Sequence, residues 1–181
     1  RIFFVPDLAS KIRFLYFCSS NCCRGPVIIN SSDNKLTVMS YVRVMIHTVW
    51  GTKNKVPFLT SEVRAKLIFH IKENAHLKQI YVDTINGYTE HIHCLLGLNA
   101  DMSIAKTLNL IKGESAHWIN KNELVKSKFE WADEYYAVSV SESIIYKVRR
   151  YIQNQEEHHR KLSFSQECET FLSRYGFQVG G

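Results

Sequence analysis

The sequence predicts a single α+β domain with the element order β-α-β-β-α-β, the split arrangement of ferredoxin-like folds. Runs rich in β-branched and aromatic residues predict strands over residues 41–50, over 81–97 as a pair joined by a short polar turn, and over 134–140. Two stretches with apolar residues at helical spacing lie between them. This topology gives a four-stranded antiparallel sheet with two helices on one face and the first and third strands in the centre. We expect the other face to be open to a nucleic acid or a partner subunit.

The first helix is predicted to begin at Thr60 or Ser61, either of which can cap it. Its apolar face is formed by Val63, Leu67, Ile71 and Ala75. The second helix is predicted to begin after Ser103, with Lys106 and Lys112 on its outer side. Its inner face is formed by Ile104, Leu108, Ile111, Ser115, Trp118 and Ile119. Gly113 inside this helix costs about 1 kcal/mol against alanine, which indicates a close packing contact or an early break.

Length and charge suit one domain with appendages. The chain has 181 residues, 45% of them hydrophobic, and a net charge of +6. Residues 1–38 hold five of the 23 Lys and Arg and two of the 17 Asp and Glu, so residues 39–181 keep 18 against 15, or +3. The main domain is therefore only mildly basic, and any case for nucleic-acid binding must rest on local clusters.

Residues 1–38 are predicted to be a leader of unknown role, before a core domain of residues 39–178 and a tail of residues 179–181. Three of the five cysteines fall in the leader, and the chain has no repeated Cys-x-x-Cys spacing. This usage argues against a disulfide framework or a zinc finger and favours a reducing cytoplasm. No apolar run is long enough to span a membrane.

The motif that most suggests a chemical function is His91-Ile92-His93, in the third predicted strand. Side chains two apart on a strand point to one face, so the histidines stand together while Ile92 enters the core. Neutral imidazole is the commonest metal ligand. The alternative for such an isolated pair is that one or both are ordinary half-buried histidines.

A third helix is predicted after the fourth strand, with Lys147, Tyr151 and Gln155 one turn apart on a single face. A tyrosine and an amide are thereby offered together, although a tyrosine at the edge of an amphipathic helix usually serves packing. His158 and His159, further along, are expected at the surface.

The histidine strand and the helix bearing Tyr151-Ile-Gln-Asn-Gln155 together resemble the single-tyrosine HUH transposases. These are small enzymes that move insertion sequences as single-stranded DNA, with relatives associated with repetitive palindromes. The order and spacing of further motifs agree with the resemblance: Thr52-Lys-Asn-Lys-Val-Pro57, Gly87-Tyr-Thr-Glu-His-Ile-His-Cys-Leu-Leu96, Ile111-Lys-Gly-Glu-Ser-Ala-His-Trp-Ile119 and Tyr136-Ala-Val-Ser139. The likeness runs from Met39 to about Phe177.

The resemblance implies that the protein is a DNA transposase, which cleaves and rejoins single-stranded DNA by metal-assisted transesterification. His91, His93 and Gln155 would hold a divalent ion, Mg²⁺ or Mn²⁺, acting as a Lewis acid on the scissile phosphate. Tyr151 would be the nucleophile and leave a 5′-phosphotyrosine link with a free 3′-hydroxyl.

The resemblance also implies hairpin-ended DNA as the partner and a homodimer in which the tyrosine helix often serves the other subunit. It places the protein in the prokaryotic cytoplasm, at the nucleoid when bound to DNA. Candidates for backbone contact are Lys53, Lys55, Lys106, Lys112, Lys147, Arg149 and Arg150. Trp50, Trp118 and Trp131 are candidates for base stacking, although each is more often a core residue.

Two alternatives stay open at the level of sequence. One is a catalytically inactive or domesticated module that binds single-stranded nucleic acid through the same sheet. The other is a metal-binding domain with no nucleic-acid role, which would need another strong ligand, and none is well placed in the sequence. The presence of His91, His93, Tyr151 and Gln155 together favours the enzyme.

Overall fold

The computed structural model describes residues 2–4, 14–16 and 42–176, in two compact units of residues 1–43 and 44–181. In the first unit, strand β1 (Ile2–Phe4) pairs antiparallel with β2 (Phe14–Tyr16). The remainder of the predicted leader and the predicted tail lie outside the described residues.

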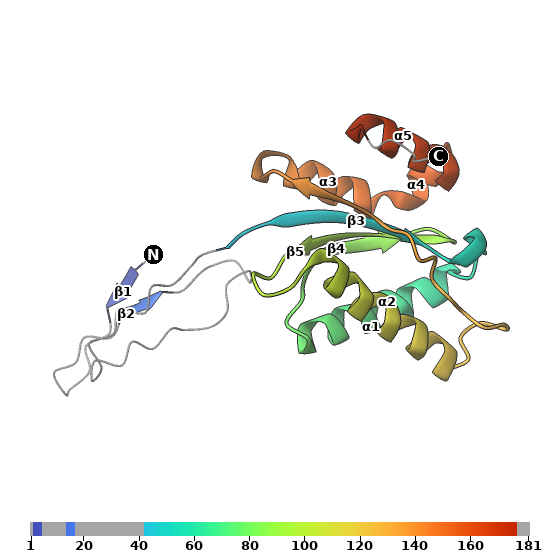
Figure 1. Ribbon diagram of the computed structural model, residues 1–181, viewed down its shortest axis with the longest axis horizontal. Helices are drawn as coiled ribbons and strands as arrows, with labels where there is room; N and C mark the ends of the chain where they lie inside the picture. Colours follow the sequence, from blue (N-terminus) through green and yellow to red (C-terminus); the bar gives the residue numbers. More distant parts are fainter. Residues whose placement is uncertain (1, 5–13, 17–41, 177–181) are drawn as a thin grey trace. The chain divides into compact units, whose positions relative to one another are not determined.

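The second unit is built on a four-stranded antiparallel sheet with the order β4-β5-β3-β6. Its strands are β3 (Met45–Gly51), β4 (Tyr81–Gly87), β5 (His91–Gly97) and β6 (Tyr136–Val140). The first and third of these along the chain, β3 and β5, form the central pair. The ferredoxin-like arrangement predicted from the sequence is therefore confirmed (Figure 1).

Helices α1 (Ser61–Leu77) and α2 (Ile104–Lys121) cover one face of the sheet (Figure 1). Thr60 and Ser103 cap them, since each hydroxyl accepts a hydrogen bond from the backbone N–H three residues later. The core between helices and sheet includes Leu67, Ile71, Ile92, Leu108 and Ile119. Helix α2 runs unbroken through Gly113, where an added Cβ would meet nothing within 4 Å. Both explanations offered for this glycine are therefore wrong.

Lys112 is buried, so its expected place on the outer side of α2 is wrong. Only 9% of the residue is exposed, and its Nζ donates to the carbonyl oxygens of Ala132 at 2.7 Å and Asp133 at 3.0 Å. These carbonyls precede β6, and the long lysine side chain reaches back to them. Burial lowers the pKa of this ammonium. Lys112 thus joins α2 to the connection before β6.

Two of the three tryptophans, Trp50 and Trp131, are core residues, which is their commoner role. Trp50 and Trp131 are 1% and 7% exposed, and their rings pack edge to face with centroids 6.0 Å apart. The half-buried Trp118 stacks on His70 with a centroid separation of 4.4 Å. Trp50 and Trp131 therefore have no exposed ring face for base stacking, and His70 covers one face of Trp118.

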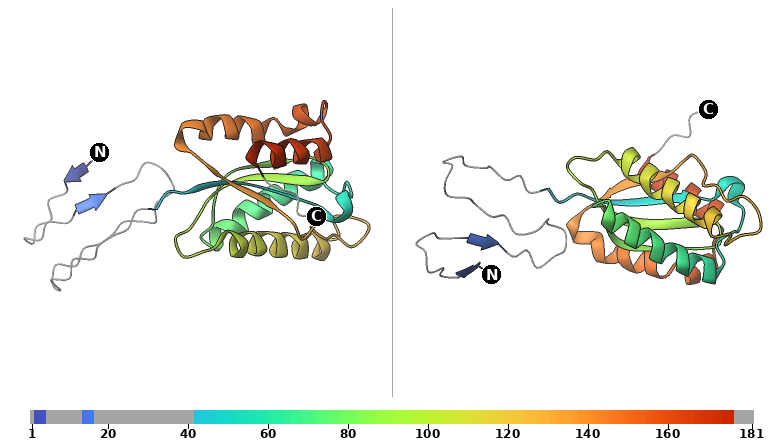
Figure 2. Two further views of the ribbon diagram at one scale, coloured as in Figure 1. Left: turned by 45° about the horizontal axis from the view of Figure 1, so that its top comes forward. Right: turned by 90° about the horizontal axis from the view of Figure 1, so that it is seen from below.

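The second face of the sheet is covered, which contradicts the expectation of an open face. Three helices lie across it: α3 (Ile145–Gln153), α4 (Gln155–His159) and α5 (Phe164–Tyr175) (Figures 1 and 2). A short helical turn, η2 (Glu142–Ile144), leads from β6 into α3. The single long helix predicted here is broken at Asn154, where the backbone leaves helical geometry at φ −95° and ψ 23°.

An apolar cluster explains why this face is covered. Met45, Leu95 and Val140 project from the sheet and pack against Ile145 and Ile152 of α3. Burying each such side chain contributes roughly 1.5–3 kcal/mol, so the amphipathic helix is held on the sheet instead of leaving its apolar stripe in water.

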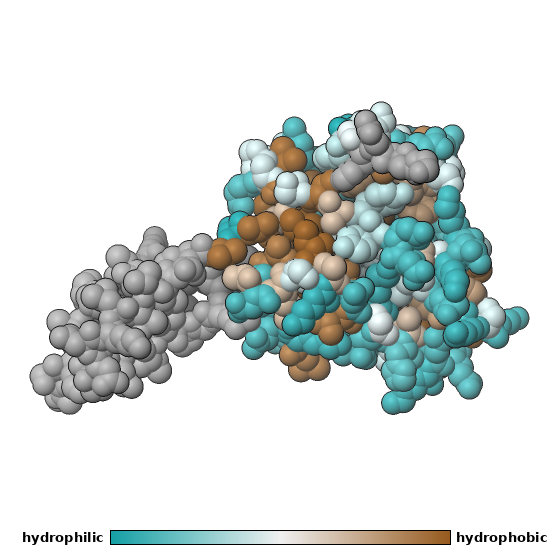
Figure 3. All heavy atoms as spheres, in the orientation of Figure 1, coloured by the Kyte–Doolittle hydropathy of each residue, from teal (hydrophilic) through white to brown (hydrophobic). Residues whose placement is uncertain are grey.

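On the face of the second unit seen in Figure 3, apolar side chains gather near the start of β3 and hydrophilic side chains cover much of the rest. Val44 and Ile144 are each 40% exposed. Among the described residues, no helix has both the length and the apolarity needed to cross a bilayer.

Candidate active site

Strand β5 holds the two motif histidines in the middle of the sheet, beneath α3, α4 and α5. His91 and His93 are 0% and 1% exposed, and Ile92 between them belongs to the core under α1 and α2. The prediction that the strand separates the histidines from Ile92 is confirmed. Both histidines are almost completely buried, unlike the ordinary half-buried histidines of the alternative interpretation.

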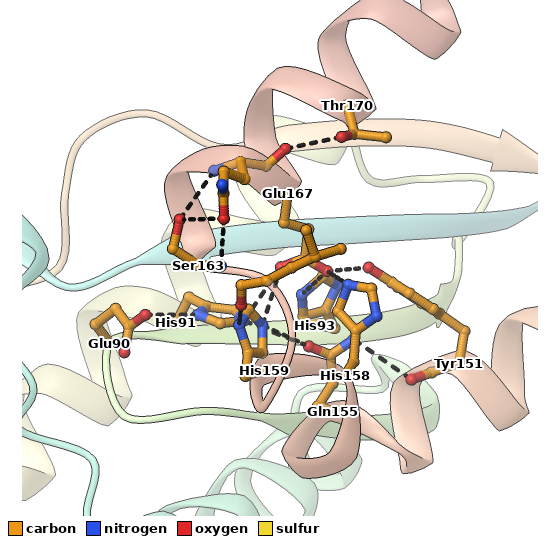
Figure 4. Close-up of polar contacts among 12 residues, drawn as sticks. Glu90, His91, His93, Tyr151, Gln155, His158, His159, Ser163, Glu167 and Thr170 are labelled. Atoms are coloured by element: carbon orange, nitrogen blue, oxygen red, sulfur yellow. Dashed lines mark hydrogen bonds and ion pairs between the residues drawn. The ribbon is translucent and has the colours of Figure 1, made fainter.

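Helices α3 and α4 bring Tyr151 and Gln155 to this pair (Figure 4). The Tyr151 ring meets the His93 ring edge to face, with centroids 5.6 Å apart. Gln155 is fully buried, and its Oε1 lies 3.4 Å from His91 Nε2. The four residues singled out in the sequence therefore meet in one place within one chain.

His159 is a further member of the site, although it was expected at the surface. Its side chain is 1% exposed, and its Nε2 lies 3.1 Å from Gln155 Oε1. Its Nδ1 donates to the Leu162 carbonyl at 2.9 Å. The break at Asn154 changes the direction of the chain, so that the next helical turn faces the sheet. The spacing of four residues between Gln155 and His159 was the available signal, because such residues share a helix face.

Glu167 is the other residue that sequence reasoning missed. It is 6% exposed, and one carboxylate oxygen, Oε1, accepts a hydrogen bond from the Tyr151 hydroxyl (Figure 4). The same oxygen lies 3.3 Å from His93 Nε2, while Oε2 lies 3.6 Å from His91 Nε2 and 3.1 Å from His159 Nε2. The sequence feature that could have revealed Glu167 is a single acidic residue on the apolar face of an amphipathic helix.

Helix α5 is fixed in place by its cap and by aromatic contacts. Ser163 and Gln166 form a reciprocal capping box at its start. Phe164 stacks on the His91 ring at a centroid separation of 4.1 Å and an interplanar angle of 1°, and Phe171 meets His47 edge to face. These contacts hold Glu167 over the histidines.

Burial dominates the electrostatics of the site. It lowers the pKa of His93 well below its ordinary value and lowers that of His159 to about 4, in both cases with help from His91. Burial also raises the pKa of the Glu167 carboxyl to about 7, and lowers that of His47, behind His93, to about 3. In the absence of a cation, the site therefore favours uncharged forms.

The donor set fits a metal ion. One nitrogen or oxygen from each of His91, His93, His159 and Glu167 lies within 4.8 Å of the corresponding atom of the others. Histidine nitrogens and carboxylate oxygens are the usual protein ligands of divalent ions. His93 Nδ1 is also 3.1 Å from His47 Nε2, the kind of outer hydrogen bond that orients a metal-binding imidazole.

A basic groove opens beside the tyrosine. It has a volume of ≈ 420 Å³ and is lined by Lys147, Arg150, Tyr151, Asn154, Glu157, His158 and Lys161. Three lysine and arginine side chains thus stand against one glutamate along one side of α3 and α4. The groove gives Tyr151 an approach from solvent that favours a negatively charged ligand.

The other basic candidates fall into different environments. The Arg149 guanidinium makes two hydrogen bonds with the Asp83 carboxylate, at 2.8 and 2.6 Å. Lys53 pairs with Glu130 at 3.1 Å, and Lys55 donates to Ser165 Oγ at 2.8 Å. The exposed Lys106 lies on α2. Of the predicted set, the structure brings Lys147 and Arg150 to the tyrosine.

Comparison with known proteins gives one family and several similar structures. Residues 40–155 match the family model described as "Transposase IS200 like". A candidate transposase from Deinococcus radiodurans R1 has a similar structure, with 23% identity and a TM-score of 0.54, covering 67% of this chain and 97% of that chain. A REP-associated tyrosine transposase bound to a REP hairpin is similar at 16% identity and a TM-score of 0.51, covering 69% of this chain and 74% of that one. No curated protein matches.

Proposed function

The chain belongs to the IS200-like transposase family, and we propose on that premise that it cleaves and rejoins single-stranded DNA through a covalent link to Tyr151. The observation that carries this proposal is the meeting of Tyr151 with His91, His93 and Gln155 in one site beside a basic groove. Three separate elements, β5, α3 and α4, supply these side chains.

The chemistry is a transesterification with the Tyr151 hydroxyl as nucleophile. Its oxygen forms a bond to the scissile phosphorus, the bond from phosphorus to the 3′ oxygen breaks, and the leaving electron pair stays on that oxygen. Glu167 accepts the hydrogen bond of the Tyr151 hydroxyl and is placed to take its proton, which ends on the 3′-hydroxyl. The products are a 5′-phosphotyrosine and a free 3′ end, and the reverse reaction rejoins strands without an external energy source.

His91, His93 and Gln155 are the proposed holders of a divalent ion, Mg²⁺ or Mn²⁺ by analogy with the family. Such an ion supplies Lewis-acid polarisation of a non-bridging phosphate oxygen. The protein's own contribution is to keep these donors in place, because His91 and His93 stand on a central strand and Gln155 is fully buried. Burial under α5 also restricts the entry of water, which would otherwise hydrolyse the covalent link.

The groove is the proposed path of the reacting strand. Lys147, Arg150 and Lys161 line it together with Tyr151, and phosphate contacts of this kind are sequence-independent. The similar structure with a bound REP hairpin supports a folded DNA end as the substrate. Exposed Lys106, together with Lys53 and Lys55 near the start of α1, is a candidate for the hairpin backbone.

Dimerisation, and the exchange of the tyrosine helix between subunits, remain proposals. Within this chain, Tyr151 lies against its own His93, which supports catalysis within one subunit. Mixing the Tyr151→Phe and His91→Ala proteins separates the two arrangements. Restored cleavage in the mixture would require Tyr151 of one subunit to act with the histidines of the other subunit.

The decisive experiment incubates the protein with labelled single-stranded DNA carrying a hairpin from the sequence flanking its gene, with Mg²⁺ or Mn²⁺. A covalent adduct that resists a denaturing gel is expected from the unaltered protein and from Tyr146→Phe. Tyr146 is the matched control, because it lies on the same helix and is 57% exposed. Tyr151→Phe and His91→Ala should give no adduct.

The second candidate function is a non-catalytic module that binds single-stranded nucleic acid. The near-complete burial of His91 and His93 under α5 favours it, because this burial restricts the approach of a phosphate to the histidines. Hairpin binding by the unaltered protein, with no adduct in either ion, would support the module and refute the transposase.

A further inference from the structure

Five donor groups converge at the candidate active site, two more than the family resemblance implies. His91, His93 and Gln155 are joined by His159 from α4 and Glu167 from α5. The residues come from one strand and two helices, and four of the five are at most 1% exposed by residue or side chain. Such a gathering of imidazoles around a carboxylate needs a physical reason.

Each ring directs Nε2 inward, and the rings of His159 and His93 use their outer nitrogen in a hydrogen bond, whereas His91 Nδ1 has no hydrogen-bond partner among the described residues. His159 Nδ1 donates to the Leu162 carbonyl, which can only accept, and His93 Nδ1 pairs with His47 Nε2 at 3.1 Å. His91 Nδ1 faces the Glu90 carboxylate at 3.7 Å. Metal-binding histidines characteristically give their second nitrogen to a carbonyl, a carboxylate or another hydrogen-bonding group. The three rings are thus oriented as ligands.

The inward atoms leave hydrogen-bonding capacity unused. His93 Nε2 and Glu167 Oε2 are buried without a hydrogen-bond partner, which is costly unless another group satisfies them. His159 Nε2 faces two acceptor oxygens, Gln155 Oε1 and Glu167 Oε2, both at 3.1 Å. A cation among these atoms would turn a set of opposed lone pairs into a set of favourable contacts.

Two of the donor spacings agree with metal coordination. Donor atoms held about 2.1 Å from an ion at tetrahedral angles lie roughly 3.4 Å from one another. Glu167 Oε2 lies 3.6 Å from His91 Nε2 and 3.1 Å from His159 Nε2, and the donor atoms of all four residues lie within 4.8 Å of one another. Glu167 Oε1 already accepts from the Tyr151 hydroxyl, which leaves Oε2 as its ligand atom.

We propose that His159 and Glu167 complete a site of three histidines and one carboxylate that binds a transition-metal ion of the zinc and cobalt class in preference to Mg²⁺. Imidazole-rich sites suit such ions, whereas Mg²⁺ prefers oxygen ligands and water. The inference rests on the proposed function for His91 and His93 and adds two ligands. It also links α5 to the reaction, since Glu167 joins the metal to the tyrosine.

The test is Co²⁺ binding by the full chain after treatment with a chelator, followed through the visible absorption of the bound ion. One equivalent of Co²⁺ should give the strong absorption of a site with low coordination number, Zn²⁺ should abolish it, and excess Mg²⁺ should not. His159→Ala and Glu167→Gln should each weaken binding by at least about 10-fold. His117→Ala is the control, because this exposed histidine lies on α2, on the opposite face of the sheet.

Several results would overturn the proposal. One is unchanged Co²⁺ affinity in both variants, and another is the weak absorption of an octahedral site in the unaltered protein, a readout that needs no variant to fold. Circular dichroism checks that the variants fold. Strong Co²⁺ binding without a DNA adduct would support this inference and refute the proposed function. A DNA adduct from the unaltered protein, with Co²⁺ binding unaffected in both variants, would support the proposed function and refute this inference.

Discussion

Replacing Ile152 with alanine tests whether α3 is packed on the sheet as described. Ile152 is 0% exposed and belongs to the cluster with Met45, Leu95, Val140 and Ile145. Truncating a completely buried isoleucine removes its transfer free energy and leaves a cavity, which together cost roughly 2–5 kcal/mol. Because the site is fully enclosed, we expect a loss of about 3 kcal/mol in the free energy of unfolding, a large fraction of the roughly 5–15 kcal/mol of a typical domain.

The assay is urea unfolding, followed by circular dichroism, of the unaltered protein, Ile152→Ala and Ile144→Ala. Ile144 precedes α3 and is 40% exposed, so its truncation should cost less than about 1 kcal/mol. Equal midpoints for the two variants would refute the packing of α3 on this face. An open face, as expected from the sequence, would leave both isoleucines largely in contact with water.

The remaining predictions concern charge. Replacing both Arg150 and Lys161 with alanine should weaken the salt dependence of single-stranded DNA binding. The slope of log K against log salt should fall in magnitude by about 1.4, or roughly 0.7 for each phosphate that is no longer neutralised. Binding titrations at several salt concentrations measure this slope, and an unchanged slope would exclude the groove as the path of the strand. In metal-free protein, folded His47 has a pKa lowered to about 3 from 6.5, so its contribution to stability is present above about pH 6.5 and is lost as the pH falls toward 3. The effect of Glu167 on stability has the opposite pH dependence, because its pKa is raised from 4.5 to about 7. Its contribution to stability is present below about pH 4.5 and is lost as the pH rises through 7. Urea unfolding across this range should show a flatter acid loss in His47→Gln and a steeper one in Glu167→Gln, and parallel curves would contradict both assignments.

Periodicity in the sequence was enough to predict how β5 presents its residues. The period of two on a strand fixes that His91 and His93 share a face and that Ile92 takes the other, whatever packs on either side. The caps at Thr60 and Ser103 are equally local, since a hydroxyl three residues before a free N–H makes the same bond in most contexts. The order of elements then limited the sheet to the topology observed.

Long-range contacts decided the site itself. Glu167 reaches the histidines because α5 folds back over the sheet, and His159 turns inward because the helix breaks at Asn154. Neither event follows from a local pattern, since each depends on which apolar faces find partners. For the same reason Lys112 and Arg149, which look exposed on a helical wheel, bind backbone carbonyls and Asp83.

By itself, the sequence determined the strands, the starts of α1 and α2 and the pairing of His91 with His93, because these depend on spacings within a few residues. Only the tertiary structure decided that the second sheet face is covered, that Tyr151 meets Glu167 and that five donors converge. Those arrangements depend on burying the apolar stripe of α3 and the aromatic side chains of α5. Burial energy is summed over contacts between distant segments, and no single stretch of the chain contains it.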